Sequence, residues 1–155
     1  MTGARVRKVN EDMIAFVPRG LGGVLEGLKG LYLNALKFSP ESISKIEAVL
    51  LQQVNAGMSP IGCSTIRSII DHEMGHVIDA LLKASFDKEL KTLYRKTLKT
   101  MGSELCEYAR TNISEFIAEG WSEYLNNPSP RPVAKRIGER LIELRDARKK
   151  EAGPK

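Results

Sequence analysis

The sequence predicts an α+β fold in which a small N-terminal β-sheet precedes a mainly helical body. Three observations support this prediction. Residues that favour strands and glycines are concentrated in residues 10–38, and apolar residues recur at helical spacing from Ser39 onward. The chain has 155 residues, 42% of them hydrophobic, which is the size and composition of one folded domain. Because strand patterns come first and helical patterns follow, the two kinds of structure are expected to segregate.

Two short strands are expected near the start of the chain. Residues 13–17 read Met-Ile-Ala-Phe-Val, and residues 31–36 read Leu-Tyr-Leu-Asn-Ala-Leu. Both segments are rich in residues that favour strands. The glycines at positions 20, 22, 23, 27 and 30 lie between them and indicate a connecting loop.

Two helices are expected next. The run Ser39-Pro-Glu-Ser supplies an N-cap and a proline at the first helical position, and Asn55-Ala-Gly57 ends this helical pattern. After a loop at residues 58–62, Ser64 or Thr65 can cap a second helix. Its apolar positions form one stripe, as expected for a helix packed on a core. The stripe consists of Ile66, Ile70, Val77 and Leu81.

Three further helices complete the predicted body. A pattern from about Asp87 to Thr100 places leucines among lysines and ends near Gly102. Asn112 can cap a fourth helix that extends to about Leu125, where the proline-rich residues 126–132 end it. The last helix is expected over about residues 133–150.

The charge of the chain is concentrated at its C-terminal end. Residues 131–155 contain nine Lys or Arg and four Asp or Glu, whereas residues 1–130 contain fifteen of each, so the net charge of +5 arises after Pro130. We interpret residues 1–155 as a single domain with a flexible basic N-terminus, residues 1–10, and a basic C-terminal helix and tail, residues 131–155. Nucleic-acid binding is disfavoured, because no nucleic-acid-binding motif is present and only 6% of residues are aromatic.

Neither a secretory signal nor a membrane span is expected. The basic residues at the N-terminus are not followed by an apolar stretch, and no apolar run approaches about 18 residues. Cys63 and Cys106 are 43 residues apart and neither has a CxxC partner, a pattern typical of reduced, buried thiols.

The only two histidines lie within five residues, in His72-Glu73-Met-Gly75-His76, which matches the HExxH pattern. On a helix this spacing puts both imidazoles on one face, where two nitrogens can reach one metal ion with the glutamate beside it. The alternative is a pair of surface histidines with an acidic neighbour. Gly75 weakens a helix by roughly 1 kcal/mol relative to Ala, which indicates that something packs closely against this turn.

A catalytic zinc ion needs a third protein ligand, and the chain has no third histidine. Glu115 and Glu119 lie four residues apart in the fourth predicted helix, so one carboxylate can bind the metal while the other accepts the spare N–H of a histidine. The local alternative makes Glu115 part of a capping box with Asn112. Asp79 is poorly placed as a ligand and better placed as an acceptor behind the site or as a helix anchor.

Taken together, His72-Glu-Met-Gly-His-Val-Ile-Asp79 and Tyr108-Ala-Arg-Thr-Asn-Ile-Ser-Glu115-Phe-Ile-Ala-Glu119-Gly-Trp resemble the catalytic domain of the anthrax lethal factor family. That family is similar in its pattern to domains of phage minor-head proteins, and residues 124–135 resemble the phage-type domains. The clear resemblance covers about residues 64–126. It implies a zincin-like fold of the gluzincin type, with an active-site helix and a second helix that supplies a metal ligand.

The resemblance implies a zinc-dependent endopeptidase. His72, His76 and Glu115 would bind Zn²⁺, Glu73 would act as general base, and Tyr108 would assist the oxyanion. Glu119 would keep the supporting role that its spacing already suggests. Ile113, Ser114 and Gly120 stand at variable positions of the pattern and are not expected to matter chemically, although Gly120 is expected to loosen the helix.

The expected partner is a peptide or protein substrate. The strand at residues 31–36, with Tyr32, Leu33 and Asn34, could pair with an extended substrate, or it could be an internal strand without a ligand. A second hypothesis is a non-catalytic zincin domain that serves as a structural or docking module, for example in a phage head with phage structural proteins as partners. Either reading places the chain in the host cytoplasm or on the virion.

Overall fold

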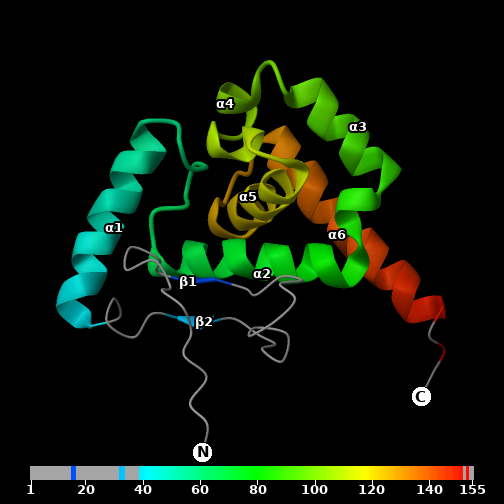
Figure 1. Ribbon diagram of the computed structural model, residues 1–155, viewed down its shortest axis with the longest axis horizontal. Helices are drawn as coiled ribbons and strands as arrows, with labels where there is room; N and C mark the ends of the chain where they lie inside the picture. The colour runs from blue at the N-terminus through cyan, green and yellow to red at the C-terminus, as the bar shows by residue number, and fades with distance from the viewer. Residues whose placement is uncertain (1–14, 17–31, 34–38, 152, 154–155) are drawn as a thin grey trace, which may run out of the picture.

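The computed structural model of the chain describes residues 15–16, 32–33, 39–151 and 153. They form a mainly helical fold, with helix α5 at the centre and α2 and α6 packed against it (Figure 1). In chain order the elements are β1 (Ala15–Phe16), β2 (Tyr32–Leu33), α1 (Pro40–Asn55), α2 (Ile66–Leu82), the 3₁₀ helix η2 (Ala84–Phe86), α3 (Lys88–Thr97), α4 (Met101–Glu104), the 3₁₀ helix η3 (Tyr108–Arg110), α5 (Ile113–Asn126) and α6 (Pro132–Glu151).

The predicted α+β fold with an N-terminal sheet is wrong, because the described residues are mainly helical. Their only strands, β1 and β2, have two residues each and pair antiparallel, with Ala15 opposite Leu33 and Phe16 opposite Tyr32. A two-stranded ladder of this length cannot bury a hydrophobic face of its own, so the core lies between helices. The rest of both predicted strands, and the predicted flexible residues 1–10, lie outside the described residues.

The first two predicted helices are confirmed, and their caps explain where they begin. The Ser39 hydroxyl accepts a hydrogen bond from the backbone N–H of Ser42, and a proline occupies the first turn of α1. Thr65, one of the two candidates, caps α2 in a reciprocal arrangement with Ser68. Helix α2 ends at Leu82, and its C-cap, Lys83, adopts a left-handed conformation with a φ of 55°.

The later helices are also confirmed, with one difference in length. Helix α3 starts at the Asp87 cap but ends at Thr97, and residues 101–104 form the separate short helix α4. Helix α5 starts at the Asn112 cap, whose side chain accepts hydrogen bonds from the N–H groups of Ser114 and Glu115. Helix α6 runs from Pro132 to Glu151, close to the predicted range.

Helix α5 is the most deeply buried helix and contributes side chains to two interfaces. Phe116 and Ile117 are fully buried, together with Ile137 and Leu141 of α6 and Leu90 of α3. The cluster also includes Met101, Leu105, Cys106, Ala109, Val133 and Ala134. Both cysteines are buried and free, as predicted.

Glycines allow α5 to approach its neighbours at backbone distance. A Cβ atom at Gly75 of α2 would lie 2.7 Å from the Cα of Ala118, which confirms that something packs closely against this turn. On the other side of α5, a Cβ at Gly120 would lie 2.3 Å from the Cδ1 of Ile137. Gly120 therefore does not simply loosen the helix, because it makes room for a buried isoleucine.

Two arginines in the first half of α6 form ion pairs. Arg136 contacts Glu89 and Glu143, and Arg140 contacts Asp87 and Glu143. The contacts with Asp87 and Glu89 tie α6 to the start of α3 and place two of the basic side chains of the C-terminal segment against acidic residues from elsewhere in the chain. No helix among the described residues is both long enough and apolar enough to span a membrane.

Candidate metal centre

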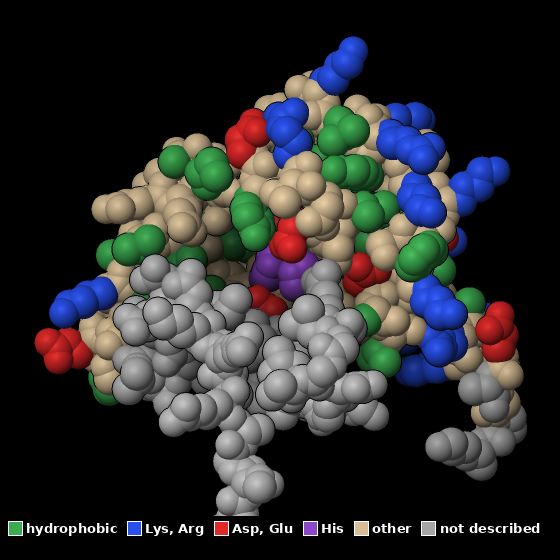
Figure 2. Space-filling model, in the orientation of Figure 1, with side chains coloured by type: hydrophobic (Ala, Val, Ile, Leu, Met, Phe, Trp, Pro, Cys, Tyr) green, Lys and Arg blue, Asp and Glu red, His purple; other side chains and the backbone are tan. Residues whose placement is uncertain are grey.

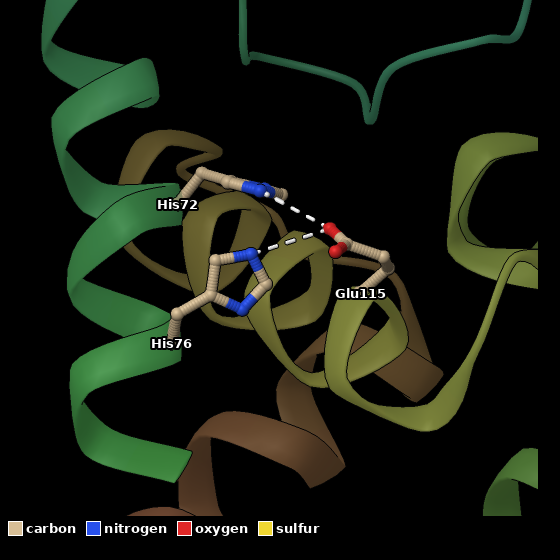
Figure 3. Close-up of side chains that lie close together, drawn as sticks. All are labelled: His72, His76 and Glu115. Atoms are coloured by element: carbon tan, nitrogen blue, oxygen red, sulfur yellow. Dashed lines mark ion pairs between the residues drawn. The ribbon is translucent and has the colours of Figure 1, made fainter. Parts of the chain in front are cut away.

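Helix α2 places the two histidines one turn apart, on the side that faces α5 (Figure 3). Their ring centroids are 4.7 Å apart and the ring planes are nearly perpendicular. His76 is buried and His72 is mostly buried. In Figure 2 the histidines lie at the centre of the visible face, between acidic side chains. The HExxH spacing therefore produces the geometry that the sequence predicts.

Glu115 extends from the first turn of α5 toward both histidines. Its Oε2 lies 3.3 Å from the Nε2 of His72 and 3.3 Å from the Nε2 of His76. The backbone N–H of Glu115 is bonded to the Asn112 cap, but its carboxylate reaches the histidines. The local cap and the site therefore use different groups of this residue, and the capping alternative does not compete with metal binding.

The donor set fits a metal ion. One ligand atom from each of His72, His76 and Glu115 lies within 4.8 Å of the others. The Oε2 of Glu115 is buried and has no hydrogen-bond partner among the described residues, although it faces two imidazole nitrogens. A buried carboxylate oxygen without a partner is costly, and a cation between these three atoms would satisfy it. Two imidazoles and one carboxylate are together suited to a divalent transition metal.

A second carboxylate lies behind His72. The Oε1 of Glu119 is 3.2 Å from the Nδ1 of His72, on the opposite side of the ring from Glu115. Burial by itself lowers the pKa of His72, but the contacts with Glu115 and Glu119 outweigh it and raise that pKa to about 10. The position of Glu119 matches the supporting role that the spacing of the two glutamates suggests.

His76 is supported differently, through a serine. The Oγ of Ser114 lies 3.5 Å from the Nδ1 of His76 and donates a hydrogen bond of 2.7 Å to the Oδ2 of Asp79. The other oxygen of Asp79 accepts a 2.6 Å bond from the backbone N–H of Ser85. Asp79 therefore lies behind the site, as predicted, but Ser114 was not expected to take part. Ser114 and Asp79 are 35 residues apart, and no local spacing in the sequence connects them.

Tyr108 lies close to the same centre, and Glu73 follows His72 on α2. Glu73 is half-buried on α2. The side chain of Tyr108, on η3, is 45% exposed, and its ring centroid is 6.4 Å from that of His72. Burial and the negative charges of Glu115, Glu119 and Glu73 raise the pKa of the Tyr108 hydroxyl, which keeps it protonated. Backbone bonds from the Tyr108 segment to the loop after α1 hold it in place, with Tyr108 N–H donating to the carbonyl of Met58.

A pocket of about 260 Å³ opens beside His72. Leu50 of α1, Met58 and Ile69 supply apolar walls, and Tyr108 also lines it. The sequence gives no signal for this pocket, because its walls come from segments that are far apart in the chain. Cys63 lies in its lining, and burial raises the pKa of this thiol to about 12.

The residues expected to pair with a substrate lie partly within the described structure. Tyr32 and Leu33 form β2, whereas Asn34 is outside the described residues. In Figure 1, β1 lies between α2 and β2, and the contacts of the strands with α2 are made mainly by β1. The predicted substrate strand is thus the outer one of the pair as seen from the histidines.

Comparisons with family models, with curated proteins and with solved structures found no match. The chemistry of the centre therefore has to be inferred from its own side chains. The described residues bring together two imidazoles, one carboxylate with an unsatisfied oxygen, and a tyrosine hydroxyl within one face of the molecule.

Proposed function

We propose that the chain is a zinc-dependent endopeptidase of the HExxH gluzincin type, similar to the catalytic domain of the anthrax lethal factor family. The observation that carries this proposal is the convergence of His72, His76 and Glu115 around one unsatisfied carboxylate oxygen. This donor set leaves room for a fourth position, the arrangement that distinguishes catalytic zinc sites from closed structural ones.

The residues around the centre have the chemistry that peptide hydrolysis needs. A bound zinc ion would supply Lewis acidity at the reacting carbonyl. Glu73 would take a proton from the attacking water and then deliver it to the leaving amine. The protonated Tyr108 hydroxyl would donate a hydrogen bond to the oxyanion that develops on the substrate carbonyl. Glu119 would hold His72 in the orientation that directs its Nε2 toward Glu115.

The pocket beside His72 also supports a substrate-binding role. Its apolar walls, Leu50, Met58 and Ile69, could hold a substrate side chain next to the reacting peptide bond. Its location matters, because the same cavity is lined by His72 and Tyr108. A substrate side chain in this pocket would therefore place its backbone beside the centre.

The test is the E73Q variant, assayed for zinc content and for cleavage of a random peptide library. We expect the variant to retain one zinc per chain and to lose cleavage by a factor of about 100 or more, because general-base catalysis contributes at least that much. The matched control is E41Q, which removes an exposed carboxylate at the start of α1. Cleavage by E73Q at the wild-type rate would contradict the proposal.

The same experiment addresses the second hypothesis. Stoichiometric zinc in the wild-type protein, without cleavage of any library peptide, would favour a non-catalytic module that uses the metal for structure or docking. Absence of zinc from the wild-type protein after incubation with the ion would contradict both functions.

A further inference from the structure

The two histidines of the centre differ in what faces their Nδ1 atoms. The Nδ1 of His72 faces a carboxylate, the Oε1 of Glu119, at 3.2 Å. The Nδ1 of His76 faces the Ser114 hydroxyl at 3.5 Å, near the upper limit of a hydrogen bond. A carboxylate can only accept, so it selects the protonated Nδ1, whereas an isolated hydroxyl can either donate or accept. The hydroxyl alone would therefore leave the tautomer of His76 undetermined.

Asp79 removes this ambiguity. The single hydrogen of the Ser114 hydroxyl is donated to the Oδ2 of Asp79 over 2.7 Å. Because that hydrogen is committed, the hydroxyl can offer only a lone pair to the imidazole of His76. This contact then favours the tautomer of His76 in which Nδ1 carries the ring hydrogen. Its Nε2, which lies 3.3 Å from the Oε2 of Glu115, keeps a free lone pair for a metal ion.

The arrangement is well anchored on the α2 side. Asp79 is buried, and its Oδ1 accepts a 2.6 Å bond from the backbone N–H of Ser85. Asp79 follows His76 by three residues on α2, whereas Ser114 belongs to the first turn of α5. The contact therefore crosses between the two helices that hold the ligands, and it joins a histidine of one helix to the first turn of the other.

We propose that Ser114 is a positioning residue of the metal centre, which transmits the acceptor character of Asp79 to His76 and so fixes the tautomer that can bind the ion. This inference depends on the metal centre of the proposed function but not on peptide cleavage. It also assigns a chemical role to a position that the sequence pattern treats as variable.

The test compares the zinc affinities of S114A and S114T with that of the wild-type protein, by competition with a chromophoric chelator. Loss of a hydrogen-bond partner behind a metal-binding histidine typically weakens metal binding by about 10–100-fold, and we expect S114A to fall in this range. S114T keeps the hydroxyl and should bind zinc within about threefold of the wild type. The matched control is S85A, because Ser85 contacts Asp79 through its backbone N–H and keeps that contact.

A second readout follows the histidine itself. In a two-bond ¹H–¹⁵N spectrum of the zinc-loaded wild-type protein, we expect the Nδ1 of His76 to appear as the protonated nitrogen. S114A should shift this Nδ1 resonance and leave that of His72 in place, because His72 is supported by Glu119. A general loss of structure would move both resonances and would also lower the thermal unfolding temperature.

The outcomes separate the possibilities. Equal zinc affinity of S114A and the wild type would overturn the proposal. An equal loss of affinity in S114A and S114T would also overturn it, because the cause would then be side-chain packing and not the hydroxyl. If S114A does not fold, S114C preserves the side-chain volume with a weaker hydrogen-bonding group, and wild-type affinity in that variant would overturn the proposal as well. A wild-type protein that binds no zinc would contradict the metal centre together with this inference.

Discussion

Helix α5 carries two glutamates whose surroundings are opposite in character. Glu123, near the end of the helix, is 0% exposed, and both of its carboxylate oxygens are bonded to the guanidinium of Arg131. The backbone N–H of Arg131 donates a further bond to the same carboxylate. Glu115, in the first turn, has a buried oxygen that lies near two imidazoles without a hydrogen bond.

The difference indicates which polar cluster maintains the fold and which one is available for chemistry. A buried charge that is fully paired has no free acceptor for a ligand. Its main effect is on stability, because removing one partner of a buried ion pair is strongly destabilising. The guanidinium of Arg131 also bonds the carbonyls of Ser103 and Leu105, so this cluster joins three segments of the chain. Glu115, in contrast, retains an unsatisfied acceptor between two potential ligands.

The largest expected effect comes from breaking the ion pair between Glu123 and Arg131. R131M should lower the free energy of unfolding by about 3–5 kcal/mol, because it leaves the charge of Glu123 buried without its ion-pair partner. Urea unfolding of the zinc-free protein measures this loss. The control, R95M, removes an exposed arginine of α3 and should change stability by less than about 0.5 kcal/mol. A loss in the free energy of unfolding as small for R131M as for R95M would contradict the claim that the Arg131–Glu123 cluster maintains the fold.

The second prediction concerns the other cluster, in which Glu115 lies between His72 and His76. E115Q should weaken zinc binding by about 100-fold or more, since in the proposed site Glu115 is a ligand and not merely a supporting group. The zinc-free protein should lose less stability than R131M does, because Glu115 contributes only to the raised pKa of His72 and its Oε2 makes no hydrogen bond. Chelator competition and urea unfolding of the same samples test both parts, with E104Q on the exposed surface as the control. A large loss of zinc-free stability would assign Glu115 to the fold.

The third prediction concerns the spacing between helices α2 and α5. G75A should destabilise the protein by roughly 1–3 kcal/mol through overpacking, partly offset by the better helix propensity of alanine. Because the nearest atom to the new Cβ is the backbone Cα of Ala118, the double variant G75A/A118G should not recover stability. Zinc affinity should fall in parallel, since the histidines and Glu115 lie on the two helices that would separate. Full recovery in the double variant would contradict this explanation.

The smallest expected effect concerns the thiol beside the pocket. Burial raises the pKa of Cys63 from its ordinary value of 9.0 to about 12, so the folded state holds this proton more tightly than the unfolded state does. The resulting stabilisation is complete below about pH 9 and is lost as the pH rises from there toward 12. Between pH 8 and 10 we expect a loss of about 1 kcal/mol from this thiol. C63A should flatten the pH dependence of unfolding in this range, and an unchanged slope would argue against the buried thiol as its source.

Local signals in the sequence predicted the helices and the relative placement of the two histidines well. Ser39, Thr65 and Asn112 each act as a cap where the sequence suggests one, since a capping side chain contacts groups only two or three residues away. The HExxH spacing predicts the geometry of the two histidines for the same reason. Gly75 also gave a correct indication, because a glycine inside a helix costs stability unless something close to it requires the space.

Contacts between distant segments were not predictable in this way. Neither the Ser114–Asp79 bond nor the Arg131–Glu123 cluster has a signature in local spacing, although the residues themselves are ordinary. The predicted sheet was wrong because strand-forming composition does not say how many strands will pair. The assignment of the positive charge to the C-terminal end was correct as a count, but Arg136 and Arg140 are paired with acidic residues in the fold.

The backbone contacts of Tyr108 have a consequence for the order in which parts of the protein should unfold on heating. The hydrogen bonds from Glu107 and Tyr108 to the carbonyls of Gly57 and Met58 attach the tyrosine to the loop that directly follows α1, and no residue of α1 is buried. Segments with little buried surface open first. Moderate heat should therefore release α1 and remove this backbone support from Tyr108, while α2 and α5 still hold His72, His76 and Glu115 together. Loss of the proposed peptidase activity should then precede loss of the proposed metal ion, and the two events would mark separate steps in the denaturation of one small domain.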